Sequence, residues 1–196
     1  MSELYIKAIN FINLTNPSNH LPYHGIDHLF SVFEHTKLVL ENDPTVKGLL
    51  KDTDLLIAAL FHDYDHSGGK ATDDVNINNA IQGVSIFHTA NPEFDLNNVI
   101  FLIRCTQYPY VVSDEELTTE ARLLRDSDMC YLLQDLSIVK LYSGLRAEFG
   151  NSLDDFLTNQ YKFISSLKFE IDYNIKMWEI LKDKRLKELQ LLKDNV

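Results

Sequence analysis

Hydrophobic residues recur every three or four positions along almost the whole chain, and this spacing constrains the fold more than any other feature. Apolar residues at that spacing line one face of an α-helix. The strict alternation of apolar and polar residues that marks a half-buried strand is nearly absent. The sequence therefore predicts an all-α fold, a multi-helix bundle of about 8–10 helices.

Prolines, glycines and polar turn residues divide this pattern into separate helices. The expected helices begin with a short one that starts at residue 4 and stops near Asn16-Pro17, and the next cover residues 26–41, 52–65, 74–90, 96–106 and 114–134. From residue 136 the pattern is helical again, with a break near Gly150 and one long stretch from 154 to 192. With 196 residues, 5 prolines and 7 glycines, the chain is expected to form a single domain, 1–196.

The charge balance excludes one broad class of partner. The chain carries 29 acidic and 18 basic residues, for a net charge of -11. A nucleic-acid surface needs clustered Lys and Arg, so no nucleic acid is expected as a partner. A small anionic nucleotide stays compatible with this charge, because a bound divalent cation can dominate the local field.

The cysteines and the hydropathy indicate a reducing, aqueous compartment. Cys105 and Cys130 each lie in an apolar run and are expected to be buried free thiols. The N-terminus has no signal-peptide pattern, and no apolar stretch approaches the ~20 residues that cross a bilayer. We expect a cytoplasmic protein that does not associate with membranes. The long C-terminal helix could pair with a copy of itself, which would give a homodimer.

Histidine and aspartate are concentrated in two short segments, residues 23–28 (YHGIDH) and 62–66 (HDYDH). The second follows directly on an apolar run, 55–61, which would hold it rigidly. Burying imidazole and carboxylate groups without partners would cost several kcal/mol of folding free energy, and a bound metal ion would remove this cost. Imidazole with carboxylate suits Zn, Mn, Fe or Mg, and no thiolate is present for a closed structural zinc site. The HExxH pattern of zinc proteases is absent.

The ordered set of motifs resembles the HD-domain metal-dependent phosphohydrolase superfamily. Within it, the chain is most similar to the catalytic domain of 3′,5′-cyclic nucleotide phosphodiesterases, over residues 20 to 180. That family has Tyr-His-Asn-x-x-His, then His-Asp-x-Asp-His-Pro-Gly, then a late Asp. The matching positions here are Tyr23-His24-Gly25-x-x-His28, His62-Asp63-x-Asp65-His66-Ser67-Gly68 and Asp128. The resemblance implies a minimal, single-domain version of the phosphodiesterase-like helical bundle.

The resemblance also implies a set of metal ligands. His28, His62, Asp63 and Asp128 would hold the first of two divalent ions (Zn, Mn, Mg or Fe), and Asp63 would bridge to the second. Asp126 competes with Asp128 for the fourth position. A water between the two ions would be the nucleophile that attacks phosphorus.

Further roles follow from the same resemblance. His24 would be the general acid that protonates the leaving 3′ oxygen, and Asp63 and His66 would complete the catalytic group. Asp65 and Gln107 would orient the ligands and their water. Gln107 stands where the family has an acid.

A later segment resembles the family's base-binding motif Gln-x-x-Phe-Ile, here Gln160 to Ile164. The resemblance implies that the Gln160 amide hydrogen-bonds the purine edge and that the Phe163 ring stacks on the base. An amide both donates and accepts, which suits the paired groups of a purine. Tyr23 is expected to contact the substrate as well.

Three functions are compatible with these residues. The first is a hydrolase that cleaves the 3′-phosphoester bond of a cyclic purine nucleotide (cAMP or cGMP) to the 5′-monophosphate. The second is an HD-type 5′-nucleotidase or phosphomonoesterase acting on a nucleotide or deoxynucleotide. The third is a nucleotide-binding protein with weak catalysis. Gln160 and Phe163 favour the first, and the missing family acids keep the second open.

Overall fold

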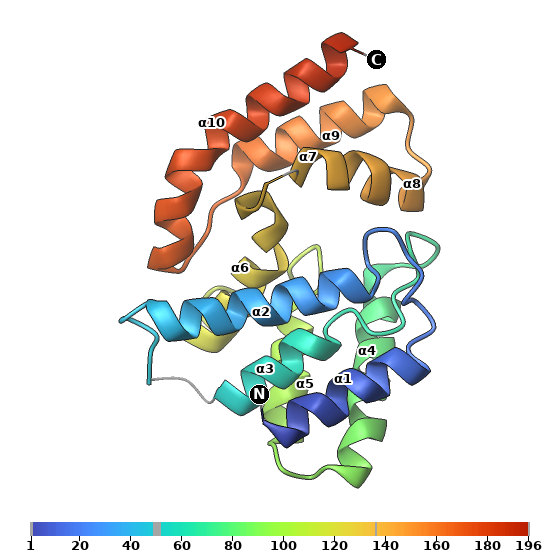
Figure 1. The fold of residues 1–196 in the computed structure, drawn as a ribbon, viewed down its shortest axis with the longest axis vertical. Coiled ribbons are helices and arrows are strands. Elements are labelled where there is room, and N and C mark those ends of the chain that lie inside the picture. Colours follow the sequence, from blue (N-terminus) through green and yellow to red (C-terminus); the bar gives the residue numbers. More distant parts are fainter. Residues whose placement is uncertain (1, 49–51, 136, 196) are drawn as a thin grey trace.

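The computed structural model describes residues 2–48, 52–135 and 137–195, and within these ranges it contains helices and no strand. The prediction of an all-α fold is confirmed. Figure 1 shows two helical layers, with the N-terminal helices below and the C-terminal helices above. The elements are α1 (Glu3–Thr15), α2 (Ile26–Asn42), α3 (Asp52–Phe61), α4 (Asp73–Ala90), α5 (Leu96–Thr106), α6 (Thr119–Asp128), the 3₁₀-helix η1 (Cys130–Leu133), α7 (Ser137–Lys140), the π-helical turn η2 (Leu141–Leu145), α8 (Arg146–Phe149), α9 (Leu153–Ser166) and α10 (Asp172–Asn195).

Helix α3 is the centre of the lower layer. Its residues Leu55 to Phe61 are all buried, and the helix contacts α1, α2, α4, α5 and α6. A helix surrounded in this way is apolar on every side, which explains the unbroken hydrophobic run. Because α3 is held from all directions, the turn that follows it at residue 62 is held in place too.

The upper layer has a hydrophobic cluster of its own. Helices α9 and α10 lie side by side in Figure 1 and contact each other. Phe156 from α9 and Trp178 and Leu189 from α10 are buried in this second cluster, together with Leu132 from η1. Arg185 is also fully buried, and its guanidinium is satisfied there: it donates to the carbonyl oxygens of Leu132 and Gln134 at 2.8 and 2.5 Å and pairs with the Glu188 carboxylate at 3.0 Å.

The helix boundaries differ from those expected at three places. The helix expected over 52–65 ends at Phe61, and the helix expected over 114–134 begins only at Thr119. The long stretch expected from 154 to 192 is interrupted between Ser166 and Asp172. There the backbone amides of Glu170 and Ile171 donate to the buried carboxylate of Asp126, which competes with helix continuation. Residue 136, where a helical stretch was expected to start, lies outside the described residues.

Both cysteines are buried and free, as expected. Among the described helices, none combines the length and the apolar character needed to cross a bilayer.

Candidate metal centre

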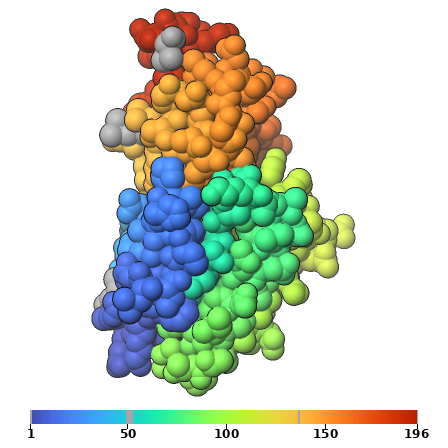
Figure 2. All heavy atoms as spheres, turned by 90° about the vertical axis from the view of Figure 1, so that its right-hand side faces the viewer, coloured from blue at the N-terminus to red at the C-terminus, as the bar shows by residue number. Residues whose placement is uncertain are grey.

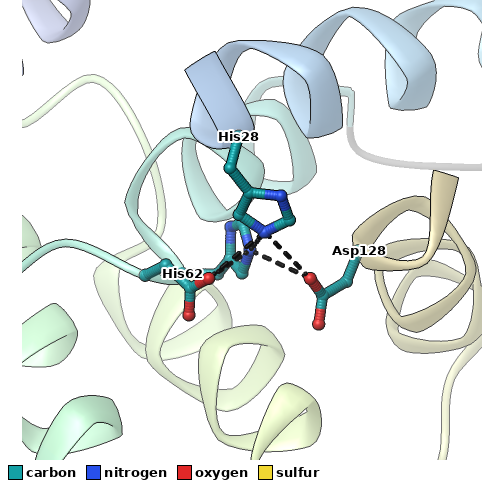
Figure 3. A group of neighbouring side chains, drawn as sticks. His28, His62 and Asp128 are labelled. Atoms are coloured by element: carbon teal, nitrogen blue, oxygen red, sulfur yellow. Dashed lines mark hydrogen bonds and ion pairs between the residues drawn. The ribbon is translucent and has the colours of Figure 1, made fainter. Parts of the chain in front are cut away.

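Three helices bring together four side chains that sequence reasoning singled out. His28 lies in the first turn of α2, His62 and Asp63 lie in the turn directly after α3, and Asp128 is the last residue of α6. Figure 3 shows His28, His62 and Asp128 pointing toward one another from separate elements. We call these four residues the metal quartet.

The spacing of the quartet suits a metal ion. The Nε2 atom of His28 lies 3.2 Å from Nε2 of His62, 3.2 Å from Oδ2 of Asp63 and 3.1 Å from Oδ1 of Asp128. The Nε2 atom of His62 lies 3.4 Å from each of the same carboxylate oxygens. Tetrahedral ligands about 2.0–2.1 Å from an ion lie roughly 3.3–3.4 Å apart, and neighbouring octahedral ligands about 3.0 Å apart. The four residues could therefore hold one divalent ion between them.

Hydrogen bonding prepares His62 for this role. Its Nδ1 donates to the carbonyl oxygen of Ala59 at 2.9 Å, which leaves the lone pair on Nε2, the atom that faces the quartet. Without a metal ion, a proton on His28 offsets the negative charge of the neighbouring carboxylates. Burial lowers the pKa of His28, but hydrogen bonds to Asp128 and Asp63 outweigh it and raise this pKa to about 9. Burial raises the pKa of Asp128, yet the two histidines lower it to about 2.

A glycine explains how α2 presents His28. Gly25 is the N-cap of α2, and its carbonyl oxygen accepts the backbone N–H of His28 at 3.0 Å. A Cβ atom at Gly25 would lie 2.2 Å from the carbonyl oxygen of Leu21. An asparagine, which the motif that this segment resembles has at this position, would therefore collide with the backbone here.

The structure separates Asp128 from its competitor Asp126. Asp126 points away from the quartet, and its carboxylate accepts the backbone N–H groups of Glu170 and Ile171 and the side-chain amide of Asn174. Of these two aspartates, Asp128 is the one that lies within ligand distance of His28 and His62. Asp126 instead joins α6 to the start of α10.

A second group of ionisable side chains adjoins the quartet, and its geometry is different. His24 donates from Nδ1 to Oε2 of Glu148 at 2.6 Å. The other carboxylate oxygen of Glu148 accepts the backbone N–H groups of Tyr23 and His24 at 2.5 and 2.9 Å. A separation of 2.6 Å is a charge-assisted hydrogen bond and is too short for two ligands of one ion. His24, His66 and Glu148 therefore suit proton transfer better than metal binding.

Glu148 is a functional candidate that sequence reasoning missed. It lies in α8, a helix of four residues, and is 124 residues from His24 in the sequence. No local motif marks it. Its contact with the segment before α2 depends on Gly144, where a Cβ atom would lie 2.8 Å from the carbonyl oxygen of Pro22.

His66 packs on His24, with ring centroids 3.8 Å apart. Burial lowers the pKa of His66 from its ordinary value, which favours the neutral ring. Its Nδ1 accepts the backbone N–H of Gly68 at 3.1 Å, which leaves the proton on Nε2. His66 is thus held as a neutral hydrogen-bond donor beside His24.

A cavity of about 330 Å³ connects the quartet to the expected base-binding residues. Asp63 and Asp128 line it, together with His24, Gln160 and Phe163. The volume lies at the lower end of the range for small-molecule sites. The Oε1 atom of Gln160 is buried and has no hydrogen-bond partner in the described structure. A buried acceptor without a partner costs about 1–3 kcal/mol, and a ligand donor that reached Oε1 after rotation of the Gln160 side chain would remove this cost.

Of the remaining expected residues, one lines the cavity and two do not. Tyr23 lines the cavity and is itself buried, with its ring stacked on His28 at 5.4 Å between centroids. Asp65 has a positive φ of 58°, and its amide is held by Asn16. Neither Asp65 nor Gln107 is among the described residues that line the cavity. Thr106, which precedes Gln107 in the sequence, does line it.

A larger hollow of about 710 Å³ lies elsewhere, between α2 and the upper layer. Its described lining includes Glu34, His35 and Met177 and no member of the quartet. The smaller cavity is the candidate site because it alone of these two reaches the candidate ligands.

Comparison with known proteins gives no match for this chain, either among protein-family models or among curated proteins.

Proposed function

We propose that this protein is an HD-type, metal-dependent phosphohydrolase that converts a cyclic purine nucleotide to the 5′-monophosphate. The observation that carries the proposal is the shared cavity. One space of about 330 Å³ is lined by carboxylates of the quartet, by the His24 of the His24–Glu148 pair, and by Gln160 with its unpaired buried oxygen. Metal binding, proton transfer and base recognition thus have separate residues around one ligand.

The charge of the lining favours a phosphodiester over a phosphomonoester. The described lining contains Asp63, Asp73 and Asp128 and no lysine or arginine. No lysine or arginine is therefore available to balance the second charge of a monoester, whereas a cyclic phosphodiester carries one negative charge. This argument favours cyclic nucleotides over the alternative 5′-nucleotidase substrates.

The chain's own residues supply the acid and the orientation. The quartet would hold a divalent ion, which supplies Lewis acidity toward phosphate and lowers the pKa of water when it is bound. His24, whose Nδ1 is fixed by Glu148, has its Nε2 left to give a proton to the departing 3′ oxygen. Gln160 and Phe163 would orient the base so that the phosphate meets the quartet.

The test is a screen with Mn²⁺ or Mg²⁺ against cyclic AMP, cyclic GMP and the 5′- and 3′-monophosphates. We expect hydrolysis of a cyclic purine nucleotide, lost with Asp63→Asn and kept with the exposed control Glu93→Gln. Hydrolysis of monophosphates alone would replace this proposal with the nucleotidase alternative. Nucleotide that is bound and recovered unchanged would point to a binding protein.

A further inference from the structure

The loop between α5 and α6 places two tyrosines at the cavity. Tyr108 and Tyr110 both line it, and their rings are perpendicular with centroids 5.7 Å apart. Their side chains remain 61% and 48% exposed. We call this pair the tyrosine wall. Nothing in the roles given above to the metal quartet, His24 or Gln160 uses it.

Two residues from different helices hold the wall in place. The backbone N–H of Tyr108 donates to Oδ2 of Asp73, in the first turn of α4, at 2.6 Å. The guanidinium carbon of Arg125, in α6, lies 3.8 Å from the ring centroid of Tyr110. Two ring systems at a cavity edge that are fixed from both sides lose little further entropy when a ligand contacts them.

Arg125 is itself held rigidly. It is buried, and its Nε donates to the carbonyl oxygen of Cys105 at 2.6 Å while Nη2 donates to that of Val112 at 3.2 Å. The guanidinium therefore spans the two ends of the segment that contains the wall. It gives the Tyr110 ring a fixed cationic support on one side.

We propose that the tyrosine wall stacks against the base or sugar of the substrate and makes the cavity selective for nucleoside phosphoesters. Aromatic faces bind nucleobases by stacking, with little dependence on which base is present. The wall belongs to the lower helical layer, whereas Gln160 and Phe163 reach the cavity from α9 in the upper layer. The ligand would then be held between the two layers. This inference rests on the proposed nucleotide substrate.

The experiment measures binding to the Mn²⁺-loaded protein by calorimetry, without turnover. The probes are 5′-AMP, which has a base, and inorganic phosphate, which has none. We expect Tyr110→Ala and Tyr108→Ala to weaken 5′-AMP binding roughly 10- to 100-fold and to leave phosphate binding unchanged. Tyr110→Phe should bind like the wild type, as should Val111→Ala, an exposed neighbour outside the described lining.

Variants of Asp73, the positioning residue that accepts the Tyr108 N–H, test separately whether this contact holds the tyrosine wall in place. Asp73→Ala should weaken 5′-AMP binding, and Asp73→Asn should restore it, because an amide oxygen still accepts the Tyr108 N–H.

The inference is overturned if Tyr110→Ala binds 5′-AMP as the wild type does, if it loses 5′-AMP and phosphate equally, or if the wild type binds no 5′-AMP. If the alanine variants lose 5′-AMP affinity but the wild type does not hydrolyse cyclic nucleotides, the proposed reaction is refuted and the role of the tyrosine wall is supported. If the wild type hydrolyses cyclic nucleotides and both alanine variants keep its KM, only the role of the tyrosine wall is refuted.

Discussion

At the scale of single residues, His28 couples protonation, metal binding and stability. Its pKa in the metal-free protein is raised from 6.5 to about 9, because hydrogen bonds to Asp128 and Asp63 outweigh the effect of burial. A folded-state pKa above the unfolded value gives stability that is fully present below pH 6.5 and is lost as the pH rises through 9. The shift corresponds to roughly 3 kcal/mol.

We therefore expect the free energy of unfolding of the metal-free protein to fall between pH 6.5 and 9, by up to about 3 kcal/mol. Denaturant titrations with a chelator present measure this change. Over the same range Mn²⁺ affinity should rise, because the ion displaces a proton. The variant His28→Asn should reduce the pH dependence without abolishing it, because burial lowers the pKa of His62 but Asp63 and Asp128 outweigh it and raise that pKa too. His20→Asn, which changes an exposed histidine, should keep the full dependence. A wild-type stability that is flat across this range would contradict the account.

Glu148 is the second residue with a separable effect. Its carboxylate fixes His24 through Nδ1, so under the proposed function Glu148→Gln should leave the cavity intact but misalign the proposed proton donor. We expect kcat to fall about 10- to 100-fold with little change in KM. Steady-state kinetics on the cyclic nucleotide measure this split. The exposed Glu93→Gln change is the matched control, and a loss confined to KM would show that Glu148 acts on binding instead.

The sequence revealed the residues of this site unequally. His28, His62 and Asp63 stand in short clusters beside hydrophobic runs, so they could be singled out from local pattern as candidate metal ligands. From the sequence, Asp128 is preferred to Asp126 only through the family resemblance, because both follow the same apolar run and only the fold turns one of them toward the histidines. Glu148 had no signal, since its partner is 124 residues away.

At the scale of elements, the turn after α3 and the short helix α8 position the chemistry. The segment η2–α8 lies against Pro22, and this approach brings Glu148 to the backbone of Tyr23 and His24. Gly144 makes the approach possible, because any Cβ atom there would lie 2.8 Å from the carbonyl oxygen of Pro22.

Gly144→Ala should therefore push α8 away from this segment. We expect an unfolding free energy lower by about 1–3 kcal/mol, since overpacking outweighs the gain in helix propensity of at most about 1 kcal/mol. We also expect a loss of kcat that resembles Glu148→Gln. Thermal denaturation and kinetics test both effects, with exposed Ser143→Ala as the control. A more stable and fully active variant would refute the close approach.

Helix positions were predictable from periodicity, whereas some helix ends were not. The break between α9 and α10 has no proline or glycine, and it arises from a long-range contact with Asp126. By contrast, α6 starts at Thr119 rather than 114 because Thr118 caps it by accepting the backbone N–H of Ala121. This cap is a local signal that hydrophobic periodicity alone does not include.

At the scale of the whole molecule, the cavity lies where two hydrophobic clusters meet. In Figure 2 the later helices sit above the earlier ones as two adjoining masses. The lower cluster surrounds α3 and the upper one surrounds Phe156 and Trp178. The arrangement of the layers could not be read from the sequence, because it depends on contacts between residues far apart along the chain.

Arg185 joins α10 to the segment that follows Asp128. It is fully buried, and it donates to the carbonyl oxygens of Leu132 and Gln134. Arg185→Met would leave both carbonyls without this donor, and we expect a loss of about 3 kcal/mol or more in unfolding free energy. Chemical denaturation measures the loss. The adjacent exposed change Lys184→Met should cost little, and equal effects of the two variants would contradict this role.

The central claim is that the quartet binds a divalent metal ion, and the most direct measurement is calorimetric titration of the metal-free protein with Mn²⁺. Two variants make a matched pair, Asp128→Asn and Asp126→Asn, with folding checked by circular dichroism. We expect the wild type and Asp126→Asn to bind the ion, and Asp128→Asn to bind it on the order of 100-fold more weakly. A wild type that binds no ion, or Asp128→Asn with wild-type affinity, would contradict the account.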